Sequence, residues 1–316
     1  MSVFLLRPAF KDYIWGGTRL KTDFDKETDL KIVAESWEVS CHKDGPSVID
    51  GGEMDGQTLQ QLITQKGADA LGSRCEKFES FPILIKLIDA KDNLSVQVHP
   101  DNEYALRVEK EYGKTEMWYI VDCDEGAELL YGFKKETSKD EFRQRIEDNT
   151  LLDVVNAVKV KKGDVFFIDA GTLHAIGKGI LIAEIQQNSN TTYRIYDFGR
   201  VGADGKPREL HIDKAVEVTE LSPPKRACEP FGAPQQISGG VSTLLAECEY
   251  FTVYSLQTDG TMSFDTKGES FHCLLCLDGE CKVSGLTLKK GQSAFITADT
   301  GVYNISGNAN LILSYV

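Results

Sequence analysis

The sequence contains no run of about 20 apolar residues, the length that a helix needs to cross a bilayer, so no membrane partner is expected. Its N-terminal stretch, M-S-V-F-L-L-R-P-A-F-K-D-Y-I-W, lacks the basic start, the long apolar stretch and the small-residue cleavage site of a signal peptide. These absences predict a cytoplasmic location.

The sequence also has fewer basic than acidic residues. The chain has 35 Lys and Arg against 49 Asp and Glu, which gives a formal net charge of −14. Binding to a phosphate backbone needs a basic surface, so nucleic acid is not expected as a partner. If the substrate is an anion, a local cluster of Lys and Arg must overcome the negative field of the whole protein.

The common nucleotide-binding motifs are missing as well. No G-x-G-x-x-G follows a predicted strand and no G-x-x-x-x-G-K-[ST] occurs, which excludes the dinucleotide-binding and P-loop classes. The eight cysteines are scattered, and the only C-x-x-C, Cys273 and Cys276, lies in a predicted strand where positions three apart face opposite ways. We interpret the cysteines as free thiols and not as a metal knuckle.

What the sequence does contain is many short strands. Segments rich in β-branched and aromatic residues alternate with Gly, Asp and Asn, and the clearest are 81–89, 94–99, 116–122, 127–133, 164–169 and 180–187. Helical spacing is limited to 58–71, 101–112 and 138–148, of which the last opens with Ser138 followed three residues later by Glu141. Sparse helices among regularly spaced strands predict a mainly β fold of sandwich or barrel type.

An internal repeat predicts two related barrels. V-K-K-G-D-V-F-F-I-D-A-G at 160–171 aligns with L-K-K-G-Q-S-A-F-I-T-A-D at 288–299, and a Pro- and Gly-rich segment at 221–240 lies between them. We therefore expect a catalytic metal-binding domain at 1–225, with short helical insertions, and a second barrel at 236–316. The second copy has no histidine after its strand, where Tyr303 stands instead, so this barrel is expected to hold no metal.

Two of the five histidines stand in patterns typical of metal ligands. Gln97 and His99 are two apart on a predicted strand and share one face, Glu116 opens another strand, and His174 follows a third strand and a Gly-containing turn. A closed antiparallel barrel can bring these side chains together. Three protein ligands suit a catalytic zinc ion, but two His and a carboxylate are equally the ligands of non-haem iron oxygenases.

Polar residues near these strands indicate an anionic ligand. Lys114 lies two residues before Glu116, Lys86 lies in an apolar strand, and Arg194 stands between Tyr193 and Asp197. Cations gathered around a metal can hold a phosphate. Ser95 could meet the same cavity, and Glu184, in an apolar strand, is expected either to pair with a cation or to serve in the site.

At these residues the sequence resembles the type I mannose-6-phosphate isomerases, specifically the short bacterial form. The shared motifs are I-W-G-G at 14–17, A-E-S-W-E-V-S-C-H at 34–42, Q-V-H-P-D at 97–101, G-K-T-E at 113–116, A-G-T-L-H-A-I-G at 170–177 and Y-R-I-Y-D at 193–197. The last four in this order are highly specific. The chain lacks the larger helical domain of longer relatives.

The resemblance implies a fold of two cupin barrels and a role for each matching residue. The zinc ligands would be Gln97, His99, Glu116 and His174, and the catalytic arginine Arg194. Glu184 and Lys114 match positions of proton handling and substrate binding. Ser95 and Lys86 match positions assigned to the phosphate in longer relatives.

The implied reaction is the reversible conversion of mannose 6-phosphate to fructose 6-phosphate through a cis-enediol, with one zinc ion per chain and a sugar phosphate as the partner. Such an enzyme would feed mannose into glycolysis or supply mannose 6-phosphate for GDP-mannose synthesis. We expect a monomer or a homodimer. Three alternatives stay open: another aldose–ketose isomerase such as a cupin glucose-6-phosphate isomerase, an iron-dependent cupin dioxygenase, and a sugar-binding cupin without catalysis.

Overall fold

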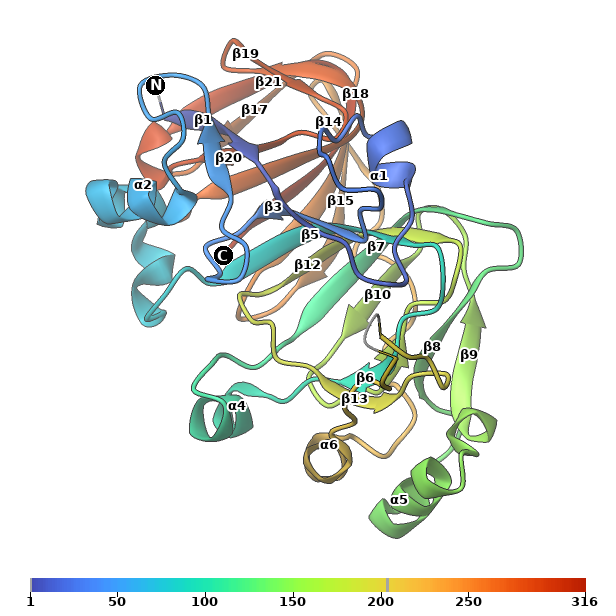
Figure 1. Ribbon diagram of the computed structural model, residues 1–316. Coiled ribbons are helices and arrows are strands. Elements are labelled where there is room, and N and C mark those ends of the chain that lie inside the picture. The colour runs from blue at the N-terminus through green and yellow to red at the C-terminus, as the bar shows by residue number, and fades with distance from the viewer. Residues whose placement is uncertain (1, 203–204) are drawn as a thin grey trace.

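The computed structural model describes residues 2–202 and 205–316 and is mainly β, as predicted (Figure 1). The first barrel is built from two sheets. One contains, in spatial order, β10 (Val165–Ile168), β7 (Glu116–Cys123), β12 (Ile180–Gln187), β5 (Ile83–Ala90), β3 (Glu35–Val39) and β2 (Ala9–Lys11). The other contains β13 (Tyr193–Tyr196), β6 (Val96–Val98), β11 (His174–Ala175), β8 (Glu128–Phe133) and β9 (Val155–Lys159).

A third, larger sheet forms the second barrel at the other end of the molecule (Figure 1). Its strand order is β14 (Gln235–Ile237), β15 (Gly240–Glu247), β16 (Thr252–Thr258), β21 (Val302–Tyr315), β18 (His272–Val283), β20 (Ser293–Ile296), β1 (Val3–Arg7) and β4 (Val48–Asp50). Two further strands complete it, because β17 (Thr261–Asp265) pairs with β21 and β19 (Leu286–Lys289) pairs with β18.

The N-terminal strand crosses the predicted division of the chain. β1 pairs antiparallel with β20, with Val3 opposite Ile296, and β4 pairs with β1 on its other side. Residues 3–7 and 48–50 therefore lie in the same sheet as the C-terminal strands. A division of the chain between 225 and 236 assigns these two segments to the first domain. This pairing covers the edge that β20 would otherwise expose.

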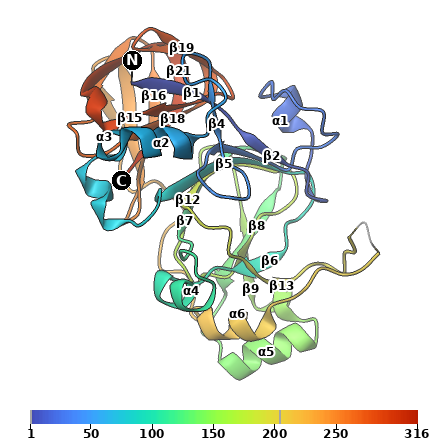
Figure 2. The same ribbon diagram turned by 60° about the vertical axis from the view of Figure 1, so that its left-hand side comes forward.

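Helices are short and sit outside the barrels, as Figures 1 and 2 show. They are α1 (Arg19–Thr22), α2 (Leu59–Lys66), α3 (Ala68–Leu71), α4 (Asn102–Val108), α5 (Lys139–Glu147) and α6 (Ile212–Val218), with 3-10 turns at Ser73–Lys77, Leu151–Asp153 and Ala298–Thr300. The predicted helical segments are confirmed, and Ser138 caps α5 by accepting from the Glu141 amide. No helix in the described residues is long and apolar enough to cross a membrane.

One apolar core joins the two barrels. Phe81, which precedes β5, packs against Phe271 and Phe295 of the second barrel, with ring centroids 5.0 and 6.1 Å away. All three side chains are almost completely buried. Each such ring contributes about 1.5–3 kcal/mol by leaving water, so the contact favours a fixed arrangement of the barrels.

The two copies of the internal repeat adopt the same local structure. Each begins with a turn at a glycine of positive φ, Gly163 at 92° and Gly291 at 81°, and continues into a four-residue strand, β10 or β20. A side chain would strain this backbone, so both copies need glycine at that position. The repeat seen in the sequence is therefore a repeat of structure.

Candidate metal centre and active site

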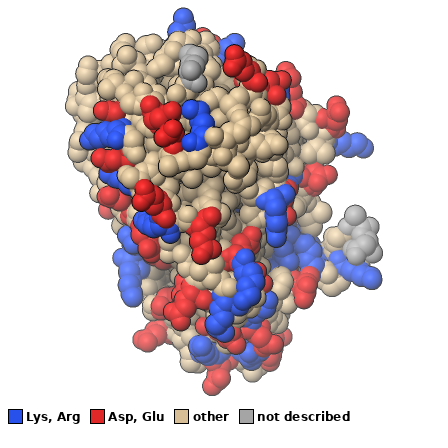
Figure 3. Space-filling model, turned by 90° about the vertical axis from the view of Figure 1, so that its left-hand side faces the viewer, with Lys and Arg blue, Asp and Glu red and all other residues tan. Residues whose placement is uncertain are grey.

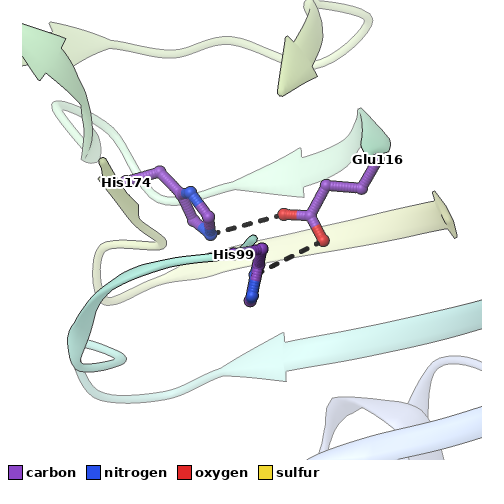
Figure 4. Close-up of side chains that lie close together, drawn as sticks. All are labelled: His99, Glu116 and His174. Carbon is purple, nitrogen blue, oxygen red and sulfur yellow. Dashed lines mark ion pairs between the residues drawn. The ribbon is translucent and has the colours of Figure 1, made fainter. Parts of the chain in front are cut away.

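Three side chains from separate strands converge inside the first barrel (Figure 4). His99 follows β6, Glu116 opens β7 and His174 opens β11. Their ligand atoms all lie within 4.8 Å of one another, with Nε2 of His174 3.4 Å and Nε2 of His99 3.8 Å from the Glu116 carboxylate. This is the predicted set, and it is the one such group of three found in the described residues.

Backbone carbonyls fix the orientation of both imidazoles. Nδ1 of His99 lies 2.8 Å from the carbonyl oxygen of Thr191, and Nδ1 of His174 lies 2.8 Å from that of Thr172. A carbonyl only accepts, so Nδ1 carries the proton and Nε2 keeps a lone pair directed toward Glu116. Metal-binding histidines are commonly held in this way.

Burial makes this group unfavourable without a cation. His99, Glu116 and His174 are at most 1% exposed. Burial lowers the pKa of His99 well below its usual value and that of His174 to about 4, so both imidazoles are neutral at pH 7. Burial, together with the charge of Glu184, raises the pKa of Glu116 to about 7. Apart from its ion pair with Lys114, neither oxygen of Glu116 has a hydrogen-bond partner in the described residues, so the donor set fits a divalent cation.

Gln97 lies beside this group on β6. Its Nε2 is 3.3 Å from Nε2 of His174, and strand pairing places it between His174 on β11 and Arg194 on β13. Turning the amide over would present its oxygen, the atom that a cation requires, at the same place. The three side chains form a row on one face of the sheet.

A buried network of opposite charges borders the histidines. Nζ of Lys114 lies 2.7 Å from Glu116 and 3.8 Å from Glu184, while Nζ of Lys86 lies 3.1 Å from Glu184 and 3.7 Å from Glu35. With all five groups ionised, three carboxylates outnumber two ammonium groups by one charge. A divalent cation would reverse that sign and leave the cluster positive, which suits an anionic substrate.

Glu184 is held as an ion within this network. Burial alone would raise its pKa, but the ammonium groups of Lys114 and Lys86 lower the pKa to about 2. The indole N–H of Trp118 donates to Oε2 at 3.0 Å, and Oε1 lies 3.1 Å from the Lys86 ammonium. Burial would lower the pKa of Lys86, yet Glu184 and Glu35 raise it above the usual value, so the pair stays charged.

A pocket of about 270 Å³ opens beside the network. The predicted residues Lys86, Ser95, Gln97, Lys114, Glu184 and Arg194 all line it. His99, Glu116 and His174 lie next to it, because Lys114 contacts His99 and Gln97 contacts His174. The structure thus brings all of the predicted site residues together around one cavity.

Arg194 enters this pocket from β13. One guanidinium nitrogen donates to the Glu209 carbonyl at 2.9 Å, while Nε is buried and has no hydrogen-bond partner among the described residues. Nearby, Asp197 accepts hydrogen bonds from Arg208 and Arg200, which lowers its pKa although burial would raise it. These contacts hold Arg208 at the pocket wall near Arg194.

Sequence reasoning missed other residues of the pocket. They include Tyr13, Glu35, Asn190, Thr192 and Arg208. Glu35 lies within the shared segment at 34–42 and could have been found there, since a carboxylate in a buried strand requires a cation. Arg208 lies in an irregular segment, and no pattern in the sequence indicates its direction.

The comparisons with known proteins agree with this site. Residues 3–133 match the family model of the phosphomannose isomerase type I catalytic domain, and residues 241–316 match that of the mannose-6-phosphate isomerase cupin domain. Mannose-6-phosphate isomerase ManA of Bacillus subtilis is 40% identical, with 98% of each chain covered. The chain belongs to the type I phosphomannose isomerase family.

Two further relatives support this membership. Mannose-6-phosphate isomerase of Streptococcus mutans is 37% identical over 96% of this chain and 94% of its own. The crystal structure of mannose 6-phosphate isomerase from Bacillus subtilis covers all of both chains with a TM-score of 0.92 and 34% identity. The resemblance inferred from the motifs is confirmed, and so is the predicted cupin fold.

Proposed function

We propose that this chain is a mannose-6-phosphate isomerase, an aldose–ketose isomerase that interconverts mannose 6-phosphate and fructose 6-phosphate. The observation that carries the proposal is the pocket in which Lys86, Lys114 and Arg194 adjoin the His99–Glu116–His174 group, in a chain that belongs to this family. The pocket combines a metal site with the cations that a sugar phosphate needs.

We assign zinc as the metal, held by His99, Glu116 and His174 with Gln97 as a fourth ligand. Two imidazoles and one carboxylate, with room for water or substrate, are typical of catalytic zinc. When bound, the ion supplies Lewis acidity to the oxygens at C1 and C2 of the sugar. The reaction moves protons without net oxidation, so a redox-inactive ion is sufficient.

Glu184 and Lys114 are our candidates for proton transfer. Glu184 is ionised and lines the pocket, so its carboxylate is available as a proton acceptor. It would take the proton from C2 and return it to C1 after the cis-enediol has formed. Lys114, 3.8 Å away, would support the hydroxyl proton exchange between O1 and O2.

The remaining cations would bind charge on the substrate. Arg194 would stabilise the developing enediolate, since a guanidinium already fixed in the pocket needs little reorganisation. Ser95 and Lys86 would contact the phosphate, with Lys86 sharing its ammonium between the phosphate and its two carboxylates. Arg208, at the same wall, adds a planar donor suited to phosphate.

A substrate panel tests the proposal. The purified protein with zinc is assayed on mannose 6-phosphate, glucose 6-phosphate and unphosphorylated mannose, with oxygen uptake followed in parallel. We expect turnover on mannose 6-phosphate in preference to the other two and no oxygen uptake. Preference for glucose 6-phosphate, or uptake of oxygen, would replace the proposal with one of the alternative functions.

A further inference from the structure

The second barrel contains a pocket at the place that corresponds to the metal site of the first. In the internal repeat, Ile168 aligns with Ile296. Ile168 on β10 pairs with Glu116 on β7, and Ile296 on β20 pairs with His272 on β18. His272 therefore occupies the register position of the candidate metal ligand Glu116.

The second barrel also has a polar side chain at the position that corresponds to His174. His174 follows the first repeat strand, and Tyr303 follows the second at nearly the same spacing. Glu116 lies 3.4 Å from His174, and Nδ1 of His272 lies 2.7 Å from the Tyr303 hydroxyl. The second barrel thus keeps the buried polar pair but replaces the metal ligands with a histidine and a tyrosine.

The pocket beside His272 is as large as the catalytic one, about 290 Å³ against about 270 Å³. Its walls are aromatic: Tyr254 and Tyr315 stack with their ring centroids 6.3 Å apart and their planes at 12°, and His272 packs 5.0 Å from Tyr315. Flat apolar faces of this kind can pack against the C–H face of a sugar ring.

Polar groups complete the pocket without giving it a net charge. Asp265 and Glu269 balance Arg74 and Lys267, and the Arg74 guanidinium lies 2.7 Å from Glu269. Burial lowers the pKa of His272 to about 4, so the imidazole is neutral at pH 7. Its Nδ1 is bonded to Tyr303, and Nε2 forms no hydrogen bond within the described part of the chain, so Nε2 is left for a ligand hydroxyl.

The geometry points to a binding site for a neutral monosaccharide in the second barrel, formed by His272, Tyr254 and Tyr315. A sugar phosphate is the wrong ligand here because the charges are balanced, whereas the catalytic pocket gathers Lys86, Lys114, Arg194 and Arg208. A hexose without phosphate offers the hydroxyls and the apolar ring face that this pocket can contact.

Saturation-transfer NMR with D-mannose and D-fructose tests the site in the full-length zinc-loaded protein. Affinity is expected in the range of about 1–10 mM, typical of a small ligand held by few contacts. The variant Tyr254→Ala should weaken the transfer signals about tenfold, since it removes one stacking face. His272→Gln should also weaken them, and Tyr254→Phe, which keeps the ring, should retain them.

Two controls separate this pocket from the catalytic one. Arg194→Ala alters the catalytic pocket and should leave the signals unchanged, as should Lys282→Ala on the exposed face of β18. Isomerase turnover of Tyr254→Ala should equal that of the unchanged protein. Absence of transfer signals, or signals lost in Arg194→Ala but retained in Tyr254→Ala and His272→Gln, would overturn the inference.

Discussion

The buried pair of Lys86 and Glu184 offers a direct test of the charge network. Both side chains are at most 5% exposed, and Nζ of Lys86 lies 3.1 Å from Glu184 and 3.7 Å from Glu35. In Lys86→Met, both carboxylates lose this partner at a place where the side chains are almost completely buried. Removing one member of a buried ion pair costs about 3–5 kcal/mol, so the free energy of unfolding should fall by that amount.

The companion variants give the magnitude of the coupling. Glu184→Gln keeps an acceptor for Trp118 and leaves Lys86 with Glu35, so its cost should be smaller, about 1–3 kcal/mol. In the double variant Lys86→Met/Glu184→Gln, the Glu184 charge that loses Lys86 in the first variant is gone, and only Glu35 stays without this partner. The loss of unfolding free energy in the double variant should therefore be about 2 kcal/mol smaller than the sum of the losses in the two single variants.

Urea unfolding of the metal-stripped protein measures these differences. All three tryptophans, Trp15, Trp37 and Trp118, are buried in the first barrel, so their fluorescence reports on the part of the molecule that holds the pair. Lys135→Met, at an exposed position, serves as the control and should change the free energy by less than about 0.5 kcal/mol. Additivity of the two substitutions within about 0.5 kcal/mol would refute the coupling.

Three further predictions concern other residues. Arg194→Ala should lower kcat about 10²–10³-fold with unchanged metal content, and full activity would remove Arg194 from catalysis. Glu116→Gln should weaken zinc binding by more than about 100-fold, because losing a residue that only orients a metal ligand already costs roughly 10–100-fold. Chelator competition measures the affinity, and an unchanged affinity would contradict the ligand set. Burial lowers the pKa of His272 to about 4. Below about pH 6.5 the imidazole is therefore protonated in the unfolded state but still neutral in the folded state, which destabilises the folded state. Between about pH 6.5 and 4 this one group should cost up to about 3 kcal/mol, and the profile of His272→Gln should be correspondingly flatter; parallel profiles would refute this.

The metal group was predictable because its residues follow local rules. The alternation of a strand puts Gln97 and His99 on one face, and the short sequence motifs around Glu116 and His174 are specific enough to identify the family. The register that places His174 opposite Gln97 then follows from barrel closure.

Long-range placement was not predictable from such rules. The pairing of Val3 with Ile296 joins opposite ends of the chain, and nothing local to the first strand specifies the sheet that it enters. The carboxylate partners of Lys86 come from β3 and β12, so their identity depends on the strand order. Arg208 is placed by its bond to Asp197, which the sequence does not indicate.

Surface charge likewise gives little guide to the site. On the face shown in Figure 3, acidic and basic side chains are interspersed, although the chain as a whole carries a net charge of −14. The cations that we assign to the substrate lie instead in a pocket, where Lys86 and Lys114 are no more than 5% exposed. Their effect on an anion depends on burial and on the metal, and not on net charge.

The most direct test of the central claim is the conversion of mannose 6-phosphate to fructose 6-phosphate by chelator-stripped protein, followed in a coupled assay before and after zinc is added. We expect no turnover without metal and full turnover when about one zinc ion per chain has bound, since a single buried group provides the ligands. Turnover that persists in fully stripped protein would contradict the metal assignment. Folded protein that stays inactive with every divalent metal tested would contradict the isomerase function itself.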